Sequence, residues 1–164
     1  MKSIQAIPTK IYTLTNLLVE IKRWRLKNKK IVFTNGVFDI LHKGHIASLS
    51  EAATFGDVLI TAINSDASVK RLKGPDRPVN DEDARALVIA SLVVTDAVVI
   101  FDEDTPLALI QQILPDVLVK GMDYSIQDVV GAQEVMANGG EVKLAKMIAG
   151  ISTSSMIEIM KNAD

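Results

Sequence analysis

The sequence predicts a doubly wound α/β domain, in which helices cover both faces of a parallel five-stranded sheet. The first observation is an alternation along the chain between short apolar, β-branched runs and segments whose apolar residues recur at helical spacing. The second is that the run at 58–63 is apolar except for Thr61, as expected of a strand buried on both faces. In this class of fold, ligands bind beyond the carboxyl ends of the strands, where the strand order reverses.

The individual elements follow from apolar spacing. The predicted strands cover residues 31–35, 58–63, 97–101, 117–119 and 142–144. The predicted helices begin at Thr15-Asn16 and then cover residues 44–55, 81–93, 105–113, 126–138 and 153–162. Residues 1–13 predict no clear element. We expect residues 1–30 to form a helical extension that packs on the main domain, residues 31–164.

Capping signals support these boundaries. Gly56 ends one helix, and Asn64-Ser65-Asp66 is suited to cap whatever follows the second strand. Asn80-Asp81 is a further N-cap signal, and Thr105 precedes a proline at the first helical position. Asn138-Gly139-Gly140 ends the penultimate helix.

The segment Val69–Asn80 breaks the pattern. It contains Gly74 and two prolines among several basic residues, so it predicts a basic loop. We expect this loop to be mobile without ligand and to close over a bound anion, because its like charges repel one another in solvent.

The composition is that of an ordinary globular protein. The 164 residues suffice for one domain with a buried core, and 48 % are hydrophobic, 23 % are charged and the net charge is −2. This balance excludes a basic nucleic-acid-binding protein and a disordered acidic tail. The absence of cysteine excludes disulfides and thiolate metal sites. Because no apolar segment resembles a signal peptide or a membrane span, we expect a cytoplasmic protein without a nucleic-acid or membrane partner.

The functional prediction centres on residues 33–46, where a strand, a glycine turn and a helix follow one another. The apolar run stops at Asn35-Gly36, and His42 and His45 stand at the start of a helical pattern. Backbone N–H groups in the first turn of a helix lack partners within the helix, and the helix dipole favours negative charge there. Two imidazoles three residues apart would face the same bound group. This arrangement predicts a phosphate-binding site.

Two motifs carry a resemblance to a known superfamily. Gly36-Val37-Phe38-Asp39 followed by His42-Lys43-Gly44-His45 matches the G-x-F-D and H-x-G-H signature of the nucleotidyltransferases. Ile151-Ser152-Thr153-Ser154-Ser155 resembles their second signature, an I-S-T-[ST] turn that opens the last helix. The resemblance implies a Rossmann-like fold and the transfer of a nucleotidyl group.

Five blocks between these motifs resemble one branch, the D-glycero-β-D-manno-heptose 1-phosphate adenylyltransferases. The blocks cover residues 64–68, 71–74, 77–80, 101–106 and 118–124. That branch occurs alone or as the C-terminal half of a bifunctional heptose kinase/adenylyltransferase, and the chain looks like the stand-alone form. The implied reaction transfers AMP from ATP to the heptose 1-phosphate, giving pyrophosphate and the ADP-heptose used in lipopolysaccharide.

The resemblance also implies roles for individual residues. Catalytic contacts to the phosphates are implied for His42, His45, Lys73 and Arg85. Nucleotide or phosphate contacts are implied for Thr34, Asn35, Gly36, Phe38, Gly44, Lys120, Gly121, Asp123, Ser152, Thr153 and Ser154. Sugar-phosphate contacts are implied for Asp39, Asn64, Asp66 and Lys70.

Each role has a structural alternative. One of the two histidines could be a satisfied structural residue, and Asp39 could orient the turn instead of binding substrate. The basic residues at 70–73 could form a solvated face, and Arg85 could be an exposed salt-bridging residue. One hydroxyl of the last signature is needed as a helix cap.

The sequence leaves alternatives in function as well. A cytidylyltransferase for a polyol phosphate such as glycerol 3-phosphate is one, although the R-T-x-G of those enzymes is replaced by Met147-Ile148-Ala149-Gly150. A nucleotide-binding regulatory module is another, against which both histidines argue. No cluster of His, Asp or Glu has the spacing of a tight metal site, so we expect Mg2+ to arrive with ATP. Relatives are often dimers, which implies a homodimer.

Overall fold

The computed structural model describes residues 6–121, 125–146, 153, 156 and 157. The described residues form one six-stranded sheet in the order β1-β4-β3-β2-β5-β6, and all neighbouring strands run parallel. The strands are β1 (Ile11–Tyr12), β2 (Ile31–Gly36), β3 (Val58–Asn64), β4 (Ala97–Phe101), β5 (Val117–Gly121) and β6 (Glu141–Ala145). The predicted doubly wound α/β class is confirmed, with six strands in place of five.

The additional strand is β1, which the sequence did not reveal. Its two residues pair with β4, in the register Ile11 to Val98 and Tyr12 to Val99. A run this short carries no periodicity, so only its partner identifies it as a strand. The following helix α1 (Leu14–Leu26) places Leu17 and Ile21 in the core, 0 % and 2 % exposed. The division into an extension and a main domain stays a prediction.

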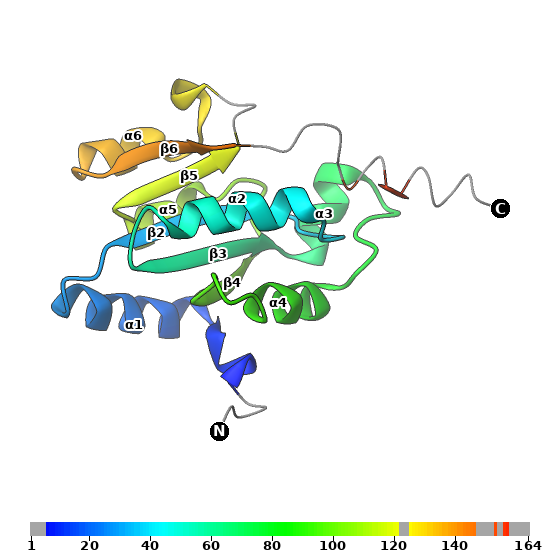
Figure 1. Cartoon of the computed structure of the whole chain (residues 1–164). Coiled ribbons are helices and arrows are strands. Elements are labelled where there is room, and N and C mark those ends of the chain that lie inside the picture. The colour runs from blue at the N-terminus through cyan, green and yellow to red at the C-terminus, as the bar shows by residue number, and fades with distance from the viewer. Residues whose placement is uncertain (1–5, 122–124, 147–152, 154–155, 158–164) are drawn as a thin grey trace.

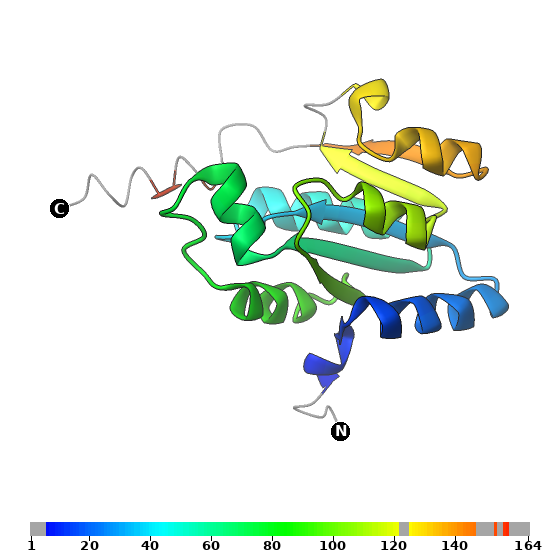
Figure 2. The ribbon, with the colours of Figure 1, turned by 180° about the vertical axis from the view of Figure 1, so that it is seen from behind.

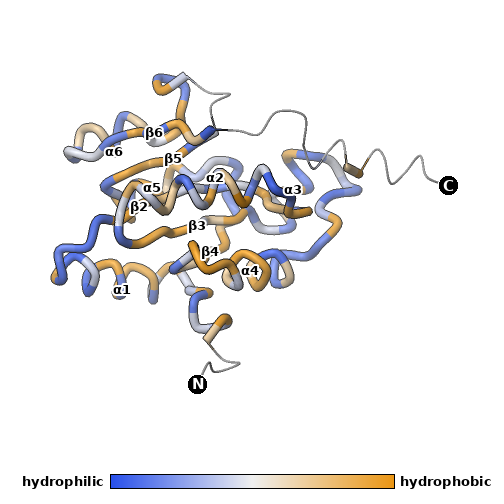
Figure 3. The backbone as a smooth tube through the Cα atoms, viewed as in Figure 1, coloured by the Kyte–Doolittle hydropathy of each residue, from blue (hydrophilic) through white to orange (hydrophobic). Residues whose placement is uncertain are grey.

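Helices cover both faces of the sheet, and Figures 1 and 2 show the two faces in turn. Helix α1 shares one core with α5 (Leu107–Ile113) and α6 (Ala132–Ala137). Helices α2 (Lys43–Ala53) and α4 (Glu82–Ala90) share the other. All seven residues of β3 are buried, as a strand covered on both faces requires, and Figure 3 shows its apolar character along most of its length.

Several helix boundaries differ from those that the sequence suggested. Helix α1 begins one residue after Thr13, whose Oγ1 accepts from Asn16 N at 3.3 Å, rather than at Thr15-Asn16. Pro106 is the N-cap of α5 and lies outside the helix. The helix expected over 126–138 is divided into a 3-10 turn, Ile126–Asp128, and α6, because Gly131 takes a φ of +86° that ends helical geometry.

The largest difference concerns the basic segment. Residues 69–73 belong to a helix, α3 (Asp66–Lys73), so the loop is shorter than the sequence suggested. Ser65 caps this helix by accepting from Ser68 N at 3.0 Å, and the basic residues occupy its last turn. That placement stabilises the helix, since positive charge is favourable at a helix C-terminus. The helix predicted over 153–162 lies mostly outside the described residues, of which Thr153, Met156 and Ile157 are helical.

The topology fixes where a ligand can bind. From β2 the chain continues to its neighbour β3 on one side, whereas β5 pairs with β2 on the other side. The strand order therefore reverses between β2 and β5, which opens a crevice beyond their carboxyl ends. Asn35 and Gly36 end β2 at this crevice, and Lys120 and Gly121 end β5.

Candidate active site

The turn from β2 into α2 is closed by a histidine. His42 is the N-cap of α2, and its Nδ1 accepts a hydrogen bond from Gly44 N at 3.2 Å. This bond satisfies one of the free N–H groups of the first turn and fixes the orientation of the imidazole. Because Nδ1 is an acceptor here, Nε2 is the ring atom left to face a ligand.

The two histidine rings lie face to face. The centroids of His42 and His45 are 3.9 Å apart with an interplanar angle of 21°, and Phe38 packs edge-on against His45 at 5.3 Å. His45 Nδ1 is buried and has no hydrogen-bond partner among the described residues. Burial, together with the neighbouring His42, lowers the pKa of His45 to about 4. At neutral pH this lowered pKa leaves the imidazole of His45 uncharged.

Two glycines permit this close arrangement. A Cβ at Gly44 would lie 3.0 Å from Nδ1 and Cε1 of His42, and a Cβ at Gly36 would lie 3.0 Å from the ring of Phe38. Phe38 itself has a φ of +50°, which is uncommon for a bulky residue. Strain of this kind concentrates at functional sites, where surrounding structure holds it in place.

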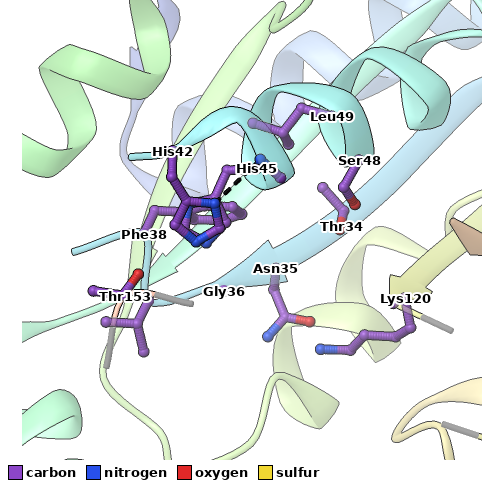
Figure 4. A pocket seen from close by; sticks show the side chains of 13 residues that line it. Thr34, Asn35, Gly36, Phe38, His42, His45, Ser48, Leu49, Lys120 and Thr153 are labelled. Atoms are coloured by element: carbon purple, nitrogen blue, oxygen red, sulfur yellow. Dashed lines mark hydrogen bonds between the residues drawn. The ribbon is translucent and has the colours of Figure 1, made fainter. Parts of the chain in front are cut away.

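A pocket of about 260 Å3 lies in front of the histidines at the crevice between β2 and β5 (Figure 4). Its lining combines the end of β2, the first turns of α2 and the end of β5. The residues that line it are Thr34, Asn35, Gly36, Val37, Phe38, His42, Gly44, His45, Ser48, Leu49, Lys120, Gly121 and Thr153. The pocket thus presents a helix N-terminus, two imidazoles and one ammonium group to a bound molecule.

The structure brings together most of the residues that the resemblance placed at the nucleotide. Both histidines line this pocket, together with the ends of β2 and β5 and with Thr153. Thr153 Oγ1 donates a hydrogen bond to Ile40 O at 3.2 Å. Asp123, Ser152 and Ser154 lie outside the described residues. Sequence analysis missed Val37, Ser48 and Leu49. The last two stand three and four residues after His45, so helical spacing alone would have placed them on the same face.

Asp39 is engaged within the protein. It accepts from Arg77 Nε at 2.7 Å and from the backbone N–H groups of Val79 and Asn80 at 2.9 Å. Burial by itself raises the pKa of Asp39, but these hydrogen bonds together hold that pKa below its usual value. Its side chain is 1 % exposed. The structural alternative for Asp39, which anchors the end of the basic loop, is the one that this geometry supports.

Arg85 is placed differently from either role considered for it. Its side chain is 0 % exposed, and it donates to the carbonyl oxygens of Val37, Asn64 and Asn80 and to Asp66 Oδ1. It does not line the pocket that contains the histidines. Through these bonds the guanidinium connects Val37, directly after β2, with Asn64, the last residue of β3. Asp66, which the resemblance placed at the sugar phosphate, accepts a hydrogen bond from Arg85 through Oδ1.

The remaining candidates lie away from the histidines. Asn64 is buried and donates from Nδ2 to Ser68 Oγ at 3.0 Å. Lys70 and Lys73 are exposed in the last turn of α3. None of these three lines the pocket at the histidines.

Within the described part of the chain, no group of three or more His, Asp or Glu residues is arranged to hold a metal ion. In the same part of the chain, no helix has the length and apolar character needed to cross a membrane.

Comparison with known proteins identifies similar chains. The chain is 51 % identical over 157 residues to the bifunctional protein HldE of Koribacter versatilis. The aligned region covers 96 % of this chain and 32 % of that protein. It is also 54 % identical over 134 residues to the bifunctional protein HldE of Azorhizobium caulinodans. This second aligned region covers 82 % of this chain and 28 % of that protein. The chain therefore spans about a third of the length of these relatives.

Two solved structures have a similar fold. A lipopolysaccharide core biosynthesis protein from Thermoplasma volcanium is 29 % identical with a TM-score of 0.59, over 75 % of this chain and 99 % of that one. A pantoate-beta-alanine ligase from Francisella tularensis is 17 % identical with a TM-score of 0.60, and the match covers 93 % of this chain and 76 % of that one. At this low identity the similarity shows a shared fold alone.

A family model described as cytidylyltransferase-like matches residues 33–159. That range begins in β2 and includes both histidines, Lys120 and the second signature. Since the match covers most of the chain, this protein belongs to the cytidylyltransferase-like family.

Proposed function

We propose that the protein is an adenylyltransferase that transfers AMP from ATP to D-glycero-β-D-manno-heptose 1-phosphate. The observation that carries the nucleotidyl transfer is the stacked pair of His42 and His45 at the N-terminus of α2, in a pocket at the crevice between β2 and β5. The acceptor is supported by the blocks that resemble heptose 1-phosphate adenylyltransferases and by the similarity to the HldE proteins and to a lipopolysaccharide core biosynthesis protein.

In the proposed reaction, an oxygen of the sugar phosphate attacks the α-phosphorus of ATP. A new P–O bond forms as the bond to the bridging oxygen breaks, and pyrophosphate leaves with the electron pair. Such a transfer depends on alignment and on neutralising the negative charge of the transition state. His42, His45, the N–H groups of α2 and Lys120 are the groups of the pocket suited to this task.

We infer that Mg2+ is bound to the triphosphate when ATP enters. The ion would neutralise charge on the phosphates, as metal ions generally do in phosphoryl transfer. Residues of this chain would bind the phosphate oxygens that the metal leaves free. A homodimer remains a proposal by analogy with relatives.

The alternative function is that of a cytidylyltransferase, with CTP as the nucleotide and a polyol phosphate as the acceptor. The central blocks favour ATP, because they resemble the heptose branch and because the R-T-x-G of the glycerol-phosphate cytidylyltransferases is missing. Selectivity between the two bases would come from base-edge contacts that leave buried polar groups unpaired when the wrong base binds.

Pyrophosphate release tests the proposal. The purified chain is assayed with ATP or CTP, each combined with heptose 1-phosphate, other sugar 1-phosphates and glycerol 3-phosphate. We expect rapid release only with ATP and the heptose 1-phosphate. Equal turnover with CTP, or preference for glycerol 3-phosphate, would establish the cytidylyltransferase alternative instead.

A further inference from the structure

One buried side chain on α4 connects the backbone segments behind the turn from β2 into α2. The side chain of Arg85 is 0 % exposed, and its guanidinium donates four hydrogen bonds. Nη1 donates to Val37 O at 2.9 Å and to Asn64 O at 2.8 Å. Nε donates to Asn80 O at 3.0 Å, and Nη2 donates to Asp66 Oδ1 at 2.7 Å. Three of the four acceptors are therefore backbone carbonyl groups.

This set of acceptors fixes the backbone as well as pairing a charge. A guanidinium is planar and presents its N–H groups in a rigid fork, so it imposes the positions of the oxygens that it binds. Nη1 serves both Val37 O, directly after β2, and Asn64 O, at the end of β3. The ends of these two strands are therefore held in one arrangement by a single nitrogen atom.

The bond to Val37 O also sets the orientation of the peptide group between Val37 and Phe38. In a trans peptide, the C=O group and the N–H group that follows it point in opposite directions. Because Val37 O points toward Arg85, the N–H of Phe38 points away from Arg85, and it has no acceptor among the described residues. Val37 and Phe38 line the pocket at the histidines, whereas Arg85 does not. Figure 4 shows the Phe38 ring beside the two histidine rings.

Asn80 extends the same support to Asp39. Its carbonyl oxygen accepts from Arg85, its N–H donates to Asp39 Oδ1 at 2.9 Å, and its Nδ2 donates to Asp39 O at 2.6 Å. The carbonyl groups before and after Phe38 are thus both held, and Phe38 between them has a φ of +50°. A bulky residue keeps such a φ only where the surrounding structure enforces it. Arg85 is a central part of that structure.

We propose that Arg85 is a positioning residue for nucleotidyl transfer, which holds Val37 O so that the N–H of Phe38 faces the phosphates of a nucleotide in the pocket at the histidines. Arg85 itself does not touch the nucleotide, and this role replaces the phosphate contact that the resemblance implied for it. An N–H group that is oriented in advance stabilises the charge of a transition state without reorganising during the reaction. The assignment rests on the proposed nucleotidyl transfer.

Arg85→Lys tests whether the fork of the guanidinium or its charge is needed. Lysine keeps the positive charge but has its three donors on one nitrogen atom, so it cannot hold the same carbonyl groups. We expect kcat to fall about 10²-fold, the scale of a misplaced donor at a transition state, while the KM for ATP changes by less than about three-fold. If the charge alone mattered, lysine would restore activity, so a kcat near that of the wild type would overturn the proposal.

Asp81→Ala is the matched control for stability. Asp81 is the N-cap of α4, and its Oδ1 accepts from Ala84 N at 2.7 Å. Its removal weakens the helix that carries Arg85 but removes none of the bonds of the guanidinium. We expect the thermal midpoint to fall by about 3 °C and kcat to stay within about two-fold of the wild type. If Asp81→Ala lowers kcat as far as Arg85→Lys does, any weakening of α4 impairs the enzyme and the specific role of Arg85 is refuted.

The amide of Phe38 gives a measurement on the wild-type protein, which decides the matter even if Arg85→Lys does not fold. Amide NMR spectra recorded during titration with a non-hydrolysable ATP analogue should show the Phe38 signal shifting together with the signals of Gly44 and His45. In Arg85→Lys, the shift of the Phe38 signal should be reduced more than the shifts at the start of α2. A Phe38 signal that stays unchanged in the wild type while those of α2 move would contradict the proposal.

The outcomes separate the two proposals. If the wild-type chain releases no pyrophosphate with any sugar phosphate, the proposed function fails and the positioning role fails with it. If the wild type is active but Arg85→Lys keeps its kcat, or the Phe38 amide does not respond to the ATP analogue, the role of Arg85 alone is overturned.

Discussion

His42 and His45 stack with ring centroids 3.9 Å apart, at the point where α2 begins. Two imidazolium ions at this distance would repel each other, and burial disfavours charge on His45 further. A bound triphosphate would reverse both effects because it supplies negative charge beside the rings. We therefore expect the imidazole of His45 to be neutral without a ligand and to gain a proton when the proposed triphosphate binds.

The first prediction separates the catalytic role of His42 from its role as a helix cap. His42→Ala should lower turnover by ~10²-fold, the scale of losing a preorganised electrostatic group, and should also destabilise the protein by ~1 kcal/mol through loss of the cap. His42→Asn retains a capping side chain, so its thermal midpoint should stay near that of the wild type while turnover falls as far as in His42→Ala. Turnover that recovers in His42→Asn would show that the cap is the whole role.

The second prediction concerns the pH dependence of stability. The pKa of His45 is lowered from 6.5 to about 4 in the folded state, so between these values the unfolded chain binds a proton that the folded chain does not. Stability should therefore decrease as the pH falls from about 6.5 toward about 4. Denaturant midpoints measured across this range report the effect, and His45→Gln, which does not titrate, should have a smaller slope.

A related measurement connects His45 to nucleotide binding. If the triphosphate raises the pKa of His45, binding at pH 6 should take up protons from the buffer. Calorimetry of a non-hydrolysable ATP analogue in buffers of different ionisation enthalpy measures that uptake. His45→Gln should reduce it, and equal uptake by the variant would assign the proton to another group.

The third prediction concerns Asp39 and Arg77, whose side chains are 1 % and 16 % exposed. Asp39→Asn leaves Arg77 without its charged partner in a buried position, so we expect a loss of about 3–5 kcal/mol in the free energy of unfolding. Because the pKa of Asp39 is lowered in the folded state, its contribution is present at neutral pH and is lost as the pH falls below about 3.8. Asp76→Asn, on an exposed residue of the same loop, should change stability little.

The fourth prediction revises the extent of the loop that we propose to close over the nucleotide. Residues 66–73 are helical, Gly74 N donates to Lys70 O, Arg77 N donates to Gly74 O, and the amides of Val79 and Asn80 are bonded to Asp39. Since Pro75 and Pro78 have no N–H group, Asp76 is the residue of this loop whose amide we expect to respond. Hydrogen exchange should show the amides of Gly74, Val79 and Asn80 protected without ligand, and the amide of Asp76 protected only with an ATP analogue. Exchange that is unaffected by the analogue throughout this segment would argue against closure.

Lysine variants complete that test. Lys73 directly precedes Gly74, which takes a φ of +99°, whereas Lys70 lies within α3. Lys73→Ala should therefore lower turnover more than Lys70→Ala, and the thermal midpoint of the free protein should hardly change in either variant, because both side chains are exposed. Equal losses in both variants would mean that the charge of the helix end matters, and not a contact from Lys73.

Local sequence determined the class of fold and the location of the turn from β2 into α2 that carries the two histidines. Apolar runs and capping residues are local signals, and five of the six strands and the caps at Ser65 and Asp81 follow from them. The two histidines at the start of α2 were likewise visible, since helical spacing alone places them on one side of a helix.

Tertiary structure decided which side chains remain available to a ligand. β1 is a strand only because the edge of β4 accepts it, and Arg85 is buried because the ends of β2 and β3 bring carbonyl groups from distant residues around it. Asp39 likewise finds its partners about 40 positions further along the chain. Local sequence contains no record of such partners, because the packing of the whole sheet brings them together. For that reason the sequence could propose charged residues for the site, and only the structure shows which of them are already bonded within the protein.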